Sequence, residues 1–237
     1  TYTGTTTVSQ GILQLSHASA IGGSSSASVS SGATLELTGS NISFDARPLT
    51  ITGYGYGNIG ALRNFSGNNT YTGDITLSSN TYINSYVSGE TLTLSGSIGG
   101  SGYPYLFGQG NIVLSGVLSF TSGALQVHMD SSTSTVTLSG SGTNTFSGGT
   151  SLYMGVLTLN KSNALNSGGG NISFDSYPSY ATLKFSSSDT TDYSAKFAGS
   201  GGVTIDTASQ SLIFNSTFSG INNGLTITAV SYTHLRA

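Results

Sequence analysis

Few residues of this chain carry side chains that could perform acid–base chemistry, and they are scattered. Cleavage of a polysaccharide needs two carboxyl groups, or a carboxyl with a base or a metal ion, gathered on one face of the fold. Only Asp189 and Asp192 are close in sequence, in the segment SSSDTTDYS, which has the composition of a polar loop. The nine acidic residues are Glu36, Asp45, Asp74, Glu90, Asp130, Asp175, Asp189, Asp192 and Asp206. We therefore expect no catalytic centre and no cofactor.

A second set of residues has the chemistry to bind a sugar. Asp45 and Arg47 precede the segment GYGYG, where Tyr54 and Tyr56 could stack on a sugar ring. A matching segment later in the chain has Asp175 but no arginine, which favours a structural role for the aspartate at a corner.

Tyrosines in loop-like segments are the remaining binding candidates. Exposed aromatic rings stack on sugars or pack on partner proteins, and the alternative is that each ring packs on a neighbouring corner of the same molecule. The candidates are Tyr54, Tyr56, Tyr103, Tyr105, Tyr177 and Tyr180. The first four form the predicted ligand surface.

The sequence has no motif of a metal site, a catalytic nucleophile or a phosphate-binding loop. The chain has no cysteine, and His17 and His128 each stand apart from a second ligand at metal-binding spacing, so we expect no metal site. His128 alternates with Val127 and Met129 and is predicted to point outward. The serine-rich sequence has no G-x-S-x-G turn, and its glycine runs lack the lysine of a phosphate loop.

The composition predicts a neutral all-β protein. Only 6% of residues are charged, against about 25% in ordinary domains. Serine, threonine, asparagine and glycine dominate instead, and these residues suit strands and corners rather than helices. The six Lys and Arg are scattered and the net charge is −3, so we expect no nucleic-acid partner. No run of 18 apolar residues predicts a membrane-spanning helix.

The chain repeats itself about every 72 residues. An aromatic residue, then Ser or Thr, then Gly begins modules near positions 2, 71, 146 and 218, and the segment NISFD occurs at 41–45 and again at 171–175. Such self-similarity is typical of stacked arrays, in which each unit buries its apolar face against its neighbours.

Within each module, short alternating segments predict strands that end in glycine corners. Leu13–Leu15, Leu92–Leu94 and Leu157–Leu159 have the period of two that is typical of half-buried strands. Comparable apolar pairs recur at a nearly constant interval, for example from 13 to 35 and from 183 to 203. The sequence therefore predicts a parallel β-solenoid, open at both ends, with about 20–24 residues in each coil. The predicted corner glycines are Gly39, Gly96, Gly116 and Gly140.

These segments resemble the autotransporter-associated β-strand repeat, also called the passenger-associated transport repeat. Its Asn-Thr-Tyr-Thr-Gly opening, Gly-Thr-Leu-x-Leu strand and small-residue ending are matched well at 2–22 and 143–167. At 69–77 only the opening NTYTGDITL matches, and the copy near 218 is cut off.

The resemblance implies a right-handed parallel β-helix that belongs to the passenger of a Gram-negative autotransporter. Its partner would be a C-terminal outer-membrane β-barrel translocator, and its location would be the cell surface or the extracellular space. The implied role is structural or adhesive, towards surface or host glycans or proteins. The alternative is a carbohydrate-active β-helix, a polysaccharide lyase or hydrolase.

The last residues of the chain differ in sequence from the repeats that precede them. Residues 1–229 carry the repeats and form the predicted solenoid domain. The last nine residues, AVSYTHLRA, match the translation of a common DNA-library adapter. We expect residues 230–237 not to be native.

Overall fold

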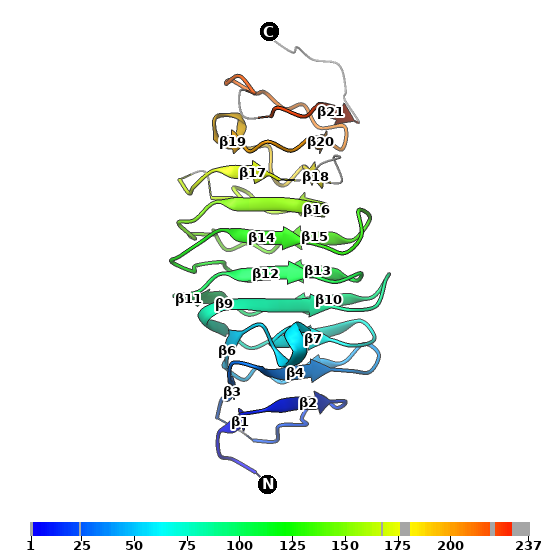
Figure 1. The fold of residues 1–237 in the computed structure, drawn as a ribbon, viewed down its shortest axis with the longest axis vertical. Coiled ribbons are helices and arrows are strands. Elements are labelled where there is room, and N and C mark those ends of the chain that lie inside the picture. The colour runs from blue at the N-terminus through cyan, green and yellow to red at the C-terminus, as the bar shows by residue number, and fades with distance from the viewer. Residues whose placement is uncertain (1, 24, 167, 176–180, 219–220, 229–237) are drawn as a thin grey trace.

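The computed structural model describes residues 2–23, 25–166, 168–175, 181–218 and 221–228. In this part of the chain the regular elements are strands and two short 3-10 helices, and every pairing between named strands is parallel. Figure 1 shows the coils stacked one above another, about ten turns in all, with the two termini at opposite ends. The predicted all-β parallel solenoid is confirmed, while residues 230–237 lie outside the described residues.

The strands are short, as expected for a chain that turns several times per coil. In the first half they are β1 (Thr6–Val8), β2 (Gly11–Leu15), β3 (Ala27–Val29), β4 (Ala33–Leu37), β5 (Ser43–Phe44), β6 (Leu49–Gly53), β7 (Leu62–Asn64), β8 (Asn69–Tyr71), β9 (Ile75–Ser85), β10 (Thr91–Leu94), β11 (Ile98–Gly100) and β12 (Pro104–Phe107). In the second half they are β13 (Asn111–Leu114), β14 (Leu125–His128), β15 (Thr135–Leu138), β16 (Thr150–Leu159), β17 (Ile172–Phe174), β18 (Ala181–Lys184), β19 (Phe197–Ala198), β20 (Val203–Asp206) and β21 (Leu225–Thr228). The 3-10 helices are η1 (Tyr56–Asn58) and η2 (Ser194–Lys196).

The strands form three parallel columns that run along the stack. The first column contains β1, β3, β6, β9 and β11. The second contains β2, β4, β7, β9, β12, β14, β16, β17 and β19. The third contains β5, β8, β10, β13, β15, β16, β18, β20 and β21. The long strands β9 and β16 each belong to two columns, so they bend around a corner of the coil.

The coils are somewhat more variable in length than the sequence predicted. The register places Leu92 opposite Ile112, a coil within the predicted range, but Leu35 opposite Leu62, a coil longer than predicted. The longer coil contains the loop with η1. The interval from 183 to 203 is not the register of its coil, because Leu183 lies opposite Ile205 rather than Val203. A shift of two residues keeps the same side chains pointing inward, so the apolar pattern alone could not detect it.

The core is a continuous apolar column whose side chains come from alternate strand positions. In β10 the two leucines are fully buried while the two threonines are half-buried. Large aromatic rings also lie inside, and Phe120 stacks on Phe146 with ring centroids 4.9 Å apart. Such pairs add roughly 0.5–1.5 kcal/mol each beyond simple burial.

The repeat motif forms a small buried unit that joins two adjacent coils. Asn69 accepts a hydrogen bond from the backbone N–H of Ile42 at 3.1 Å, and Asn144 accepts one from Leu118 at 2.9 Å. The aromatic residues two positions later in each motif, Tyr71 and Phe146, are fully buried.

The two copies of this motif nevertheless occupy different positions around the coil. Tyr71 lies in the third column, opposite Leu94. Leu118, which pairs with the other copy, bridges to Ile98 of the first column. Each copy of the motif therefore connects neighbouring coils locally. Successive copies do not occupy the same column of the solenoid.

Two of the four predicted corner glycines adopt a positive φ and two do not. Gly39 has φ 125° and Gly140 has φ 84°, as a sharp corner requires. Gly96 and Gly116 instead lie where stacked backbones come very close. A Cβ on Gly96 would overlap the carbonyl oxygen of Gly73, and a Cβ on Gly116 would overlap that of Gly96. At these corners glycine is needed for space rather than for its φ range.

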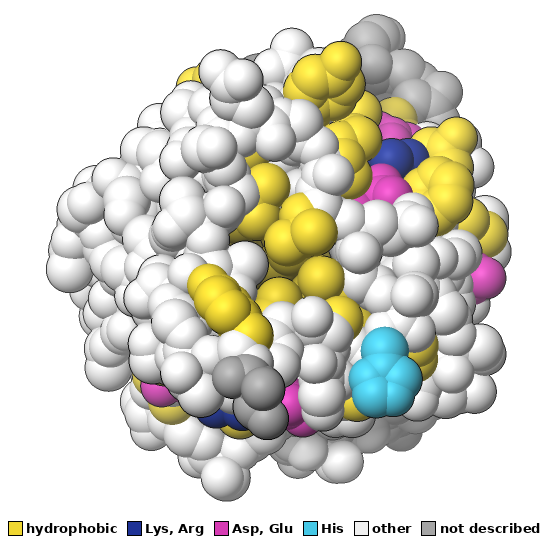
Figure 2. All heavy atoms as spheres, turned by 90° about the horizontal axis from the view of Figure 1, so that it is seen from below, with side chains coloured by type: hydrophobic (Ala, Val, Ile, Leu, Met, Phe, Trp, Pro, Cys, Tyr) yellow, Lys and Arg dark blue, Asp and Glu magenta, His cyan; other side chains and the backbone are white. Residues whose placement is uncertain are grey.

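The N-terminal end of the stack exposes the interior. Figure 2 shows hydrophobic side chains near the centre of this face, bordered mainly by uncharged polar side chains and backbone, with charged side chains at the upper right and lower edge. Among the described residues, β1 pairs only with β3 and β2 only with β4, so each has a free edge here. Leu13 packs on the core but is only partly buried.

Candidate functional site

The only acidic pair close in sequence is not arranged for catalysis. Asp189 is 1% exposed, and its Oδ2 accepts hydrogen bonds from the Ala164 N–H at 2.8 Å and the Tyr193 hydroxyl at 2.9 Å. Burial, and then the neighbouring Asp189 carboxylate, raise the pKa of Tyr193. Asp189 therefore holds two coils together and has little access to a substrate.

Asp192 connects its own loop to the next coil. Its carboxylate accepts hydrogen bonds from Ser194, through both the N–H and the hydroxyl, and from Asn215, through both the N–H and the side-chain amide. Burial acts to raise the pKa of Asp192, but these hydrogen bonds outweigh burial and hold the pKa below its ordinary value. The side chain fixes the loop to the next coil.

The predicted group around Asp45 is divided by the fold. Arg47 lies 3.9 Å from Asp45 at a partly exposed site, and its guanidinium donates to the carbonyl oxygen of Gly22. Among the described residues, no hydrogen bond, ion pair or cation–π contact links Asp45 or Arg47 to Tyr54 or Tyr56. The local structure thus favours the structural interpretation of Asp45.

The tyrosine surface takes the form of an aromatic ladder on the outer face of the second column. The ladder consists of Tyr54, Tyr82, Tyr105, His128 and Tyr153, one ring per coil. Its successive ring centroids are 4.5, 4.5, 4.5 and 5.0 Å apart. Phe107 meets the rings of Tyr82 and Tyr105 edge-on from the side. The spacing follows that of stacked strands, about 4.8 Å.

The register of the strands explains why these rings meet. Tyr82 and Tyr105 are direct partners in β9 and β12. Tyr105 lies opposite Gln126, and His128 follows two residues later on the same face of β14. A shift in register after Val127 then lets the Tyr153 ring stack on His128 with an angle of 6° between the ring planes.

Only half of the predicted ligand surface belongs to this ladder. Tyr54 and Tyr105 are members. Tyr103 packs partly buried against the core, and Tyr56 is 55% exposed outside the ladder. Tyr177 and Tyr180 lie outside the described residues.

Tyr82 and Tyr153 were not among the residues predicted from the sequence, and His128 was predicted to be an isolated surface residue. A signal was present, because Tyr82, Tyr105, His128 and Tyr153 follow one another at intervals that match the length of a coil. The outward direction of His128 was predicted correctly, because this side chain is half-buried between fully buried neighbours.

The packing of the ladder alters its acid–base behaviour. Burial lowers the pKa of His128, although the Asp175 carboxylate acts in the opposite direction. Burial, followed by the nearby Tyr82 and Asp130, raises the pKa of Tyr105. The neutral forms of both rings are therefore favoured, as expected for rings that are stacked and partly removed from water.

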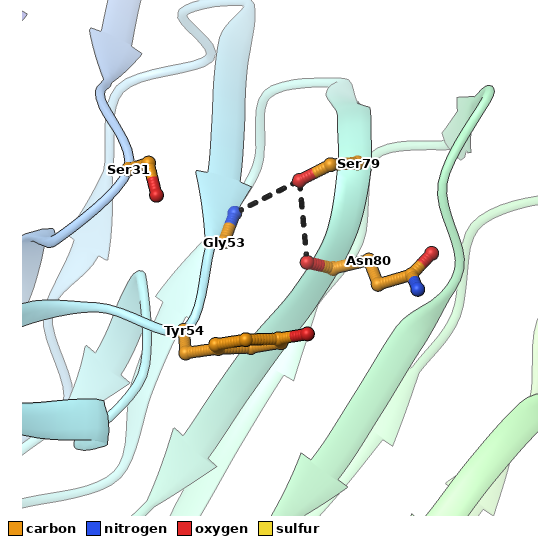
Figure 3. A pocket seen from close by; sticks show the side chains of 5 residues that line it. All are labelled: Ser31, Gly53, Tyr54, Ser79 and Asn80. Atoms are coloured by element: carbon orange, nitrogen blue, oxygen red, sulfur yellow. Dashed lines mark hydrogen bonds between the residues drawn. The ribbon is translucent and has the colours of Figure 1, made fainter.

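A small hollow adjoins the N-terminal end of the ladder. It has a volume of about 280 Å³ and is lined by Ser31, Gly53, Tyr54, Ser79 and Asn80. Figure 3 shows the Tyr54 ring nearly edge-on along one side of the hollow, with the polar residues on the side facing it. The Ser79 hydroxyl accepts from the Gly53 N–H at 3.1 Å and donates to the backbone oxygen of Asn80 at 3.3 Å.

The described part of the chain has neither a metal-binding cluster nor a membrane-spanning helix. It contains no group of three or more His, Cys, Asp or Glu side chains that could hold a metal ion. It also has no helix that is long and apolar enough to span a bilayer.

The fold and these sites define the chain as a parallel β-solenoid with an outer aromatic ladder. No protein-family model matches the sequence, and no curated protein or solved structure matches it either.

Proposed function

We propose that this solenoid is a structural and adhesive segment of a secreted, autotransporter-like passenger at the surface of a Gram-negative bacterium. The observation that supports the proposal is that the repeat motif connects one coil to the next. In both described internal copies its asparagine and aromatic residue tie one coil to the next within an uninterrupted apolar column. This is the role expected of a repeat that builds a long stalk.

The surface chemistry supports the same proposal. Few charges and many hydroxyl and amide groups leave a neutral face that suits glycans and other uncharged partners rather than nucleic acid. The absence of cysteine also suits passage through an oxidising periplasm, where a premature disulfide could trap a folded loop. The expected partner is an outer-membrane barrel encoded downstream.

The first test is the sequence of the complete gene, combined with labelling of cells that carry it. We expect further repeats after Thr228, then alternating amphipathic strands of a membrane barrel. Antibodies raised against the purified solenoid should label intact cells. A gene without a barrel region, together with label only in permeabilised cells, would contradict the proposal.

A polysaccharide-cleavage assay addresses the alternative of an enzyme. The purified chain is incubated with pectin-like and other bacterial surface polysaccharides, and new reducing ends and unsaturated products are measured. We expect none above a boiled control. Cleavage that disappears in Asp192→Asn, while the variant keeps the circular-dichroism spectrum and thermal midpoint of the original chain, would instead establish a carbohydrate-active β-helix.

A further inference from the structure

The aromatic ladder offers its ring faces to a ligand very unequally. Tyr82, Tyr105 and His128 each have a ladder ring packed before and after them, stacked or tilted, and all three side chains are half-buried. Tyr54 has one ladder neighbour, Tyr82, and is 48% exposed. Its other side borders the hollow (Figure 3). Tyr153, at the other end of the ladder, also has one ladder neighbour, His128, and is 43% exposed, but it does not line the hollow. Tyr54 is therefore the ladder ring that can stack on a ligand in this hollow.

Polar side chains beside the Tyr54 ring can form hydrogen bonds to a ligand. Among the described residues, the Ser31 hydroxyl and the Asn80 side-chain amide have no hydrogen-bond partner within the protein, whereas the Ser79 hydroxyl is held by Gly53 and Asn80 backbone. An amide has two donors and one acceptor oxygen, and a hydroxyl has one donor and two acceptor lone pairs. The hollow thus combines one apolar ring face with free donors and acceptors.

The lining also restricts which ligand fits. It contains no charged side chain, so it offers no partner for a uronate, sialate or phosphate group. The strands on either side, β6 and β9, are already paired with each other and with further strands, so an extended peptide cannot add to a free edge. The volume is below the roughly 300–1,000 Å³ of pockets that enclose drug-sized ligands. A single small, neutral, hydroxyl-rich unit is the best match.

We propose that the hollow formed by Ser31, Gly53, Tyr54, Ser79 and Asn80 binds one neutral pyranose unit of a glycan. The apolar face of the sugar stacks on Tyr54, and its hydroxyl groups exchange hydrogen bonds with Asn80 and Ser31. The rest of the glycan extends into solvent, since the hollow is open. This inference specifies the ligand class of the adhesive role and therefore rests on the proposed function.

Saturation-transfer NMR of the purified 237-residue chain tests the site directly. The probes are the methyl pyranosides of glucose, galactose, mannose and N-acetylglucosamine, with methyl glucuronide as the charged comparison. We expect weak binding, at about millimolar Kd, of at least one neutral probe and no binding of the glucuronide. Absence of signal from every neutral probe would overturn the proposal.

Substitutions in and beside the hollow then test whether the sugar binds there. Tyr54→Ala and Asn80→Ala should each weaken binding of the responding probe by roughly fivefold to tenfold, whereas Tyr54→Phe keeps the ring and should stay within about threefold. Tyr56→Ala is the matched control, because this tyrosine is similarly exposed on the same loop but does not line the hollow. Binding that survives Tyr54→Ala, or is lost in Tyr56→Ala alone, would place the sugar elsewhere and overturn the proposal.

The outcome also separates this inference from the proposed function. If antibodies label intact cells but Tyr54→Ala leaves sugar binding unchanged, the passenger role stands and the site is wrong. If the neutral pyranoside binds through Tyr54 while the protein stays inside the cell, the site stands and the passenger role is wrong.

Discussion

At the residue scale, the buried asparagine of the repeat motif is a centre of hydrogen bonding between coils. Asn69 is 1% exposed and joins three segments of the chain. Its amide donates to Asn64 Oδ1 at 2.8 Å and to the Ser66 carbonyl oxygen at 2.7 Å, and its Oδ1 accepts from Ile42. Removing it leaves those groups without partners in the interior.

Asn69→Ala is therefore expected to lower the free energy of unfolding by roughly 3 kcal/mol, because buried polar groups lose their partners. Asn68→Ala is the control, since Asn68 makes an exposed hydrogen bond to the Thr91 N–H and should cost less than about 1 kcal/mol. Urea unfolding followed by circular dichroism measures both. Equal losses in the two variants would refute the assigned role.

His128 makes stability depend on pH. Its pKa in the folded protein lies below the ordinary value of 6.5, mainly because of burial between Tyr105 and Tyr153. Below that pH the unfolded chain binds more protons than the folded chain, so this contribution to stability is present above pH 6.5 and is lost as pH falls. Burial raises the pKa of nearby Asp130, which acts in the opposite sense but only at lower pH.

His128→Phe should keep the stacking and reduce the loss of stability between about pH 7.5 and about pH 5. His17→Phe removes an exposed histidine and serves as the control. Thermal midpoints at the two pH values give the comparison. An unchanged pH dependence in His128→Phe would show that this ring does not control it.

At the element scale, glycines that stack from coil to coil let the backbone corners between strands come close to one another. Gly73, Gly96 and Gly116 follow one another up the stack, and each leaves room for the backbone of its neighbour. Alternation of apolar and polar residues sets which side of each strand faces the core. The glycine stack sets how closely the corners approach.

Gly96→Ala should destabilise the protein by about 1–3 kcal/mol, since the new methyl group overlaps the Gly73 carbonyl and the backbone must shift. Gly168→Ala is the matched control. Its added methyl would meet only the Asn166 side chain, at an ordinary 3.5 Å, so the change should stay within about 0.5 kcal/mol. Chemical denaturation measures both, and a Gly96→Ala variant as stable as the Gly168→Ala variant would contradict the close-approach argument.

At the scale of the whole molecule, the solenoid is a rod whose N-terminal face has an apolar centre and free strand edges (Figure 2). Free edges and exposed core side chains favour pairing with another copy. The isolated 237-residue chain is therefore expected to associate end to end as its concentration rises.

Leu13→Lys should suppress this association, because it places a charge on the end face beside the core. Ser101→Lys adds the same charge at an exposed position in the middle of the stack and should have no effect. Light scattering over a concentration series measures the average mass of each variant. A wild-type chain that remains monomeric throughout would refute the prediction.

Much of this architecture was predictable from the sequence, because the information is local. Period-two alternation in segments such as Leu92–Leu94 identifies strands and their inward face, and recurrence at coil length identifies stacking. The burial of Phe120 and Phe174 follows from the same pattern. By itself the sequence determined an all-β, parallel, stacked protein with a neutral surface.

The tertiary structure alone decided which residues meet across coils. A two-residue change of register keeps the inward pattern, so the partner of Leu183 could not be predicted from it. Loops of different length likewise move one copy of the repeat motif to another column. The aromatic ladder, the free face of Tyr54 and the structural roles of Asp189 and Asp192 depend on these contacts. These contacts depend on the lengths of all the preceding coils and loops. A local sequence pattern does not contain that information.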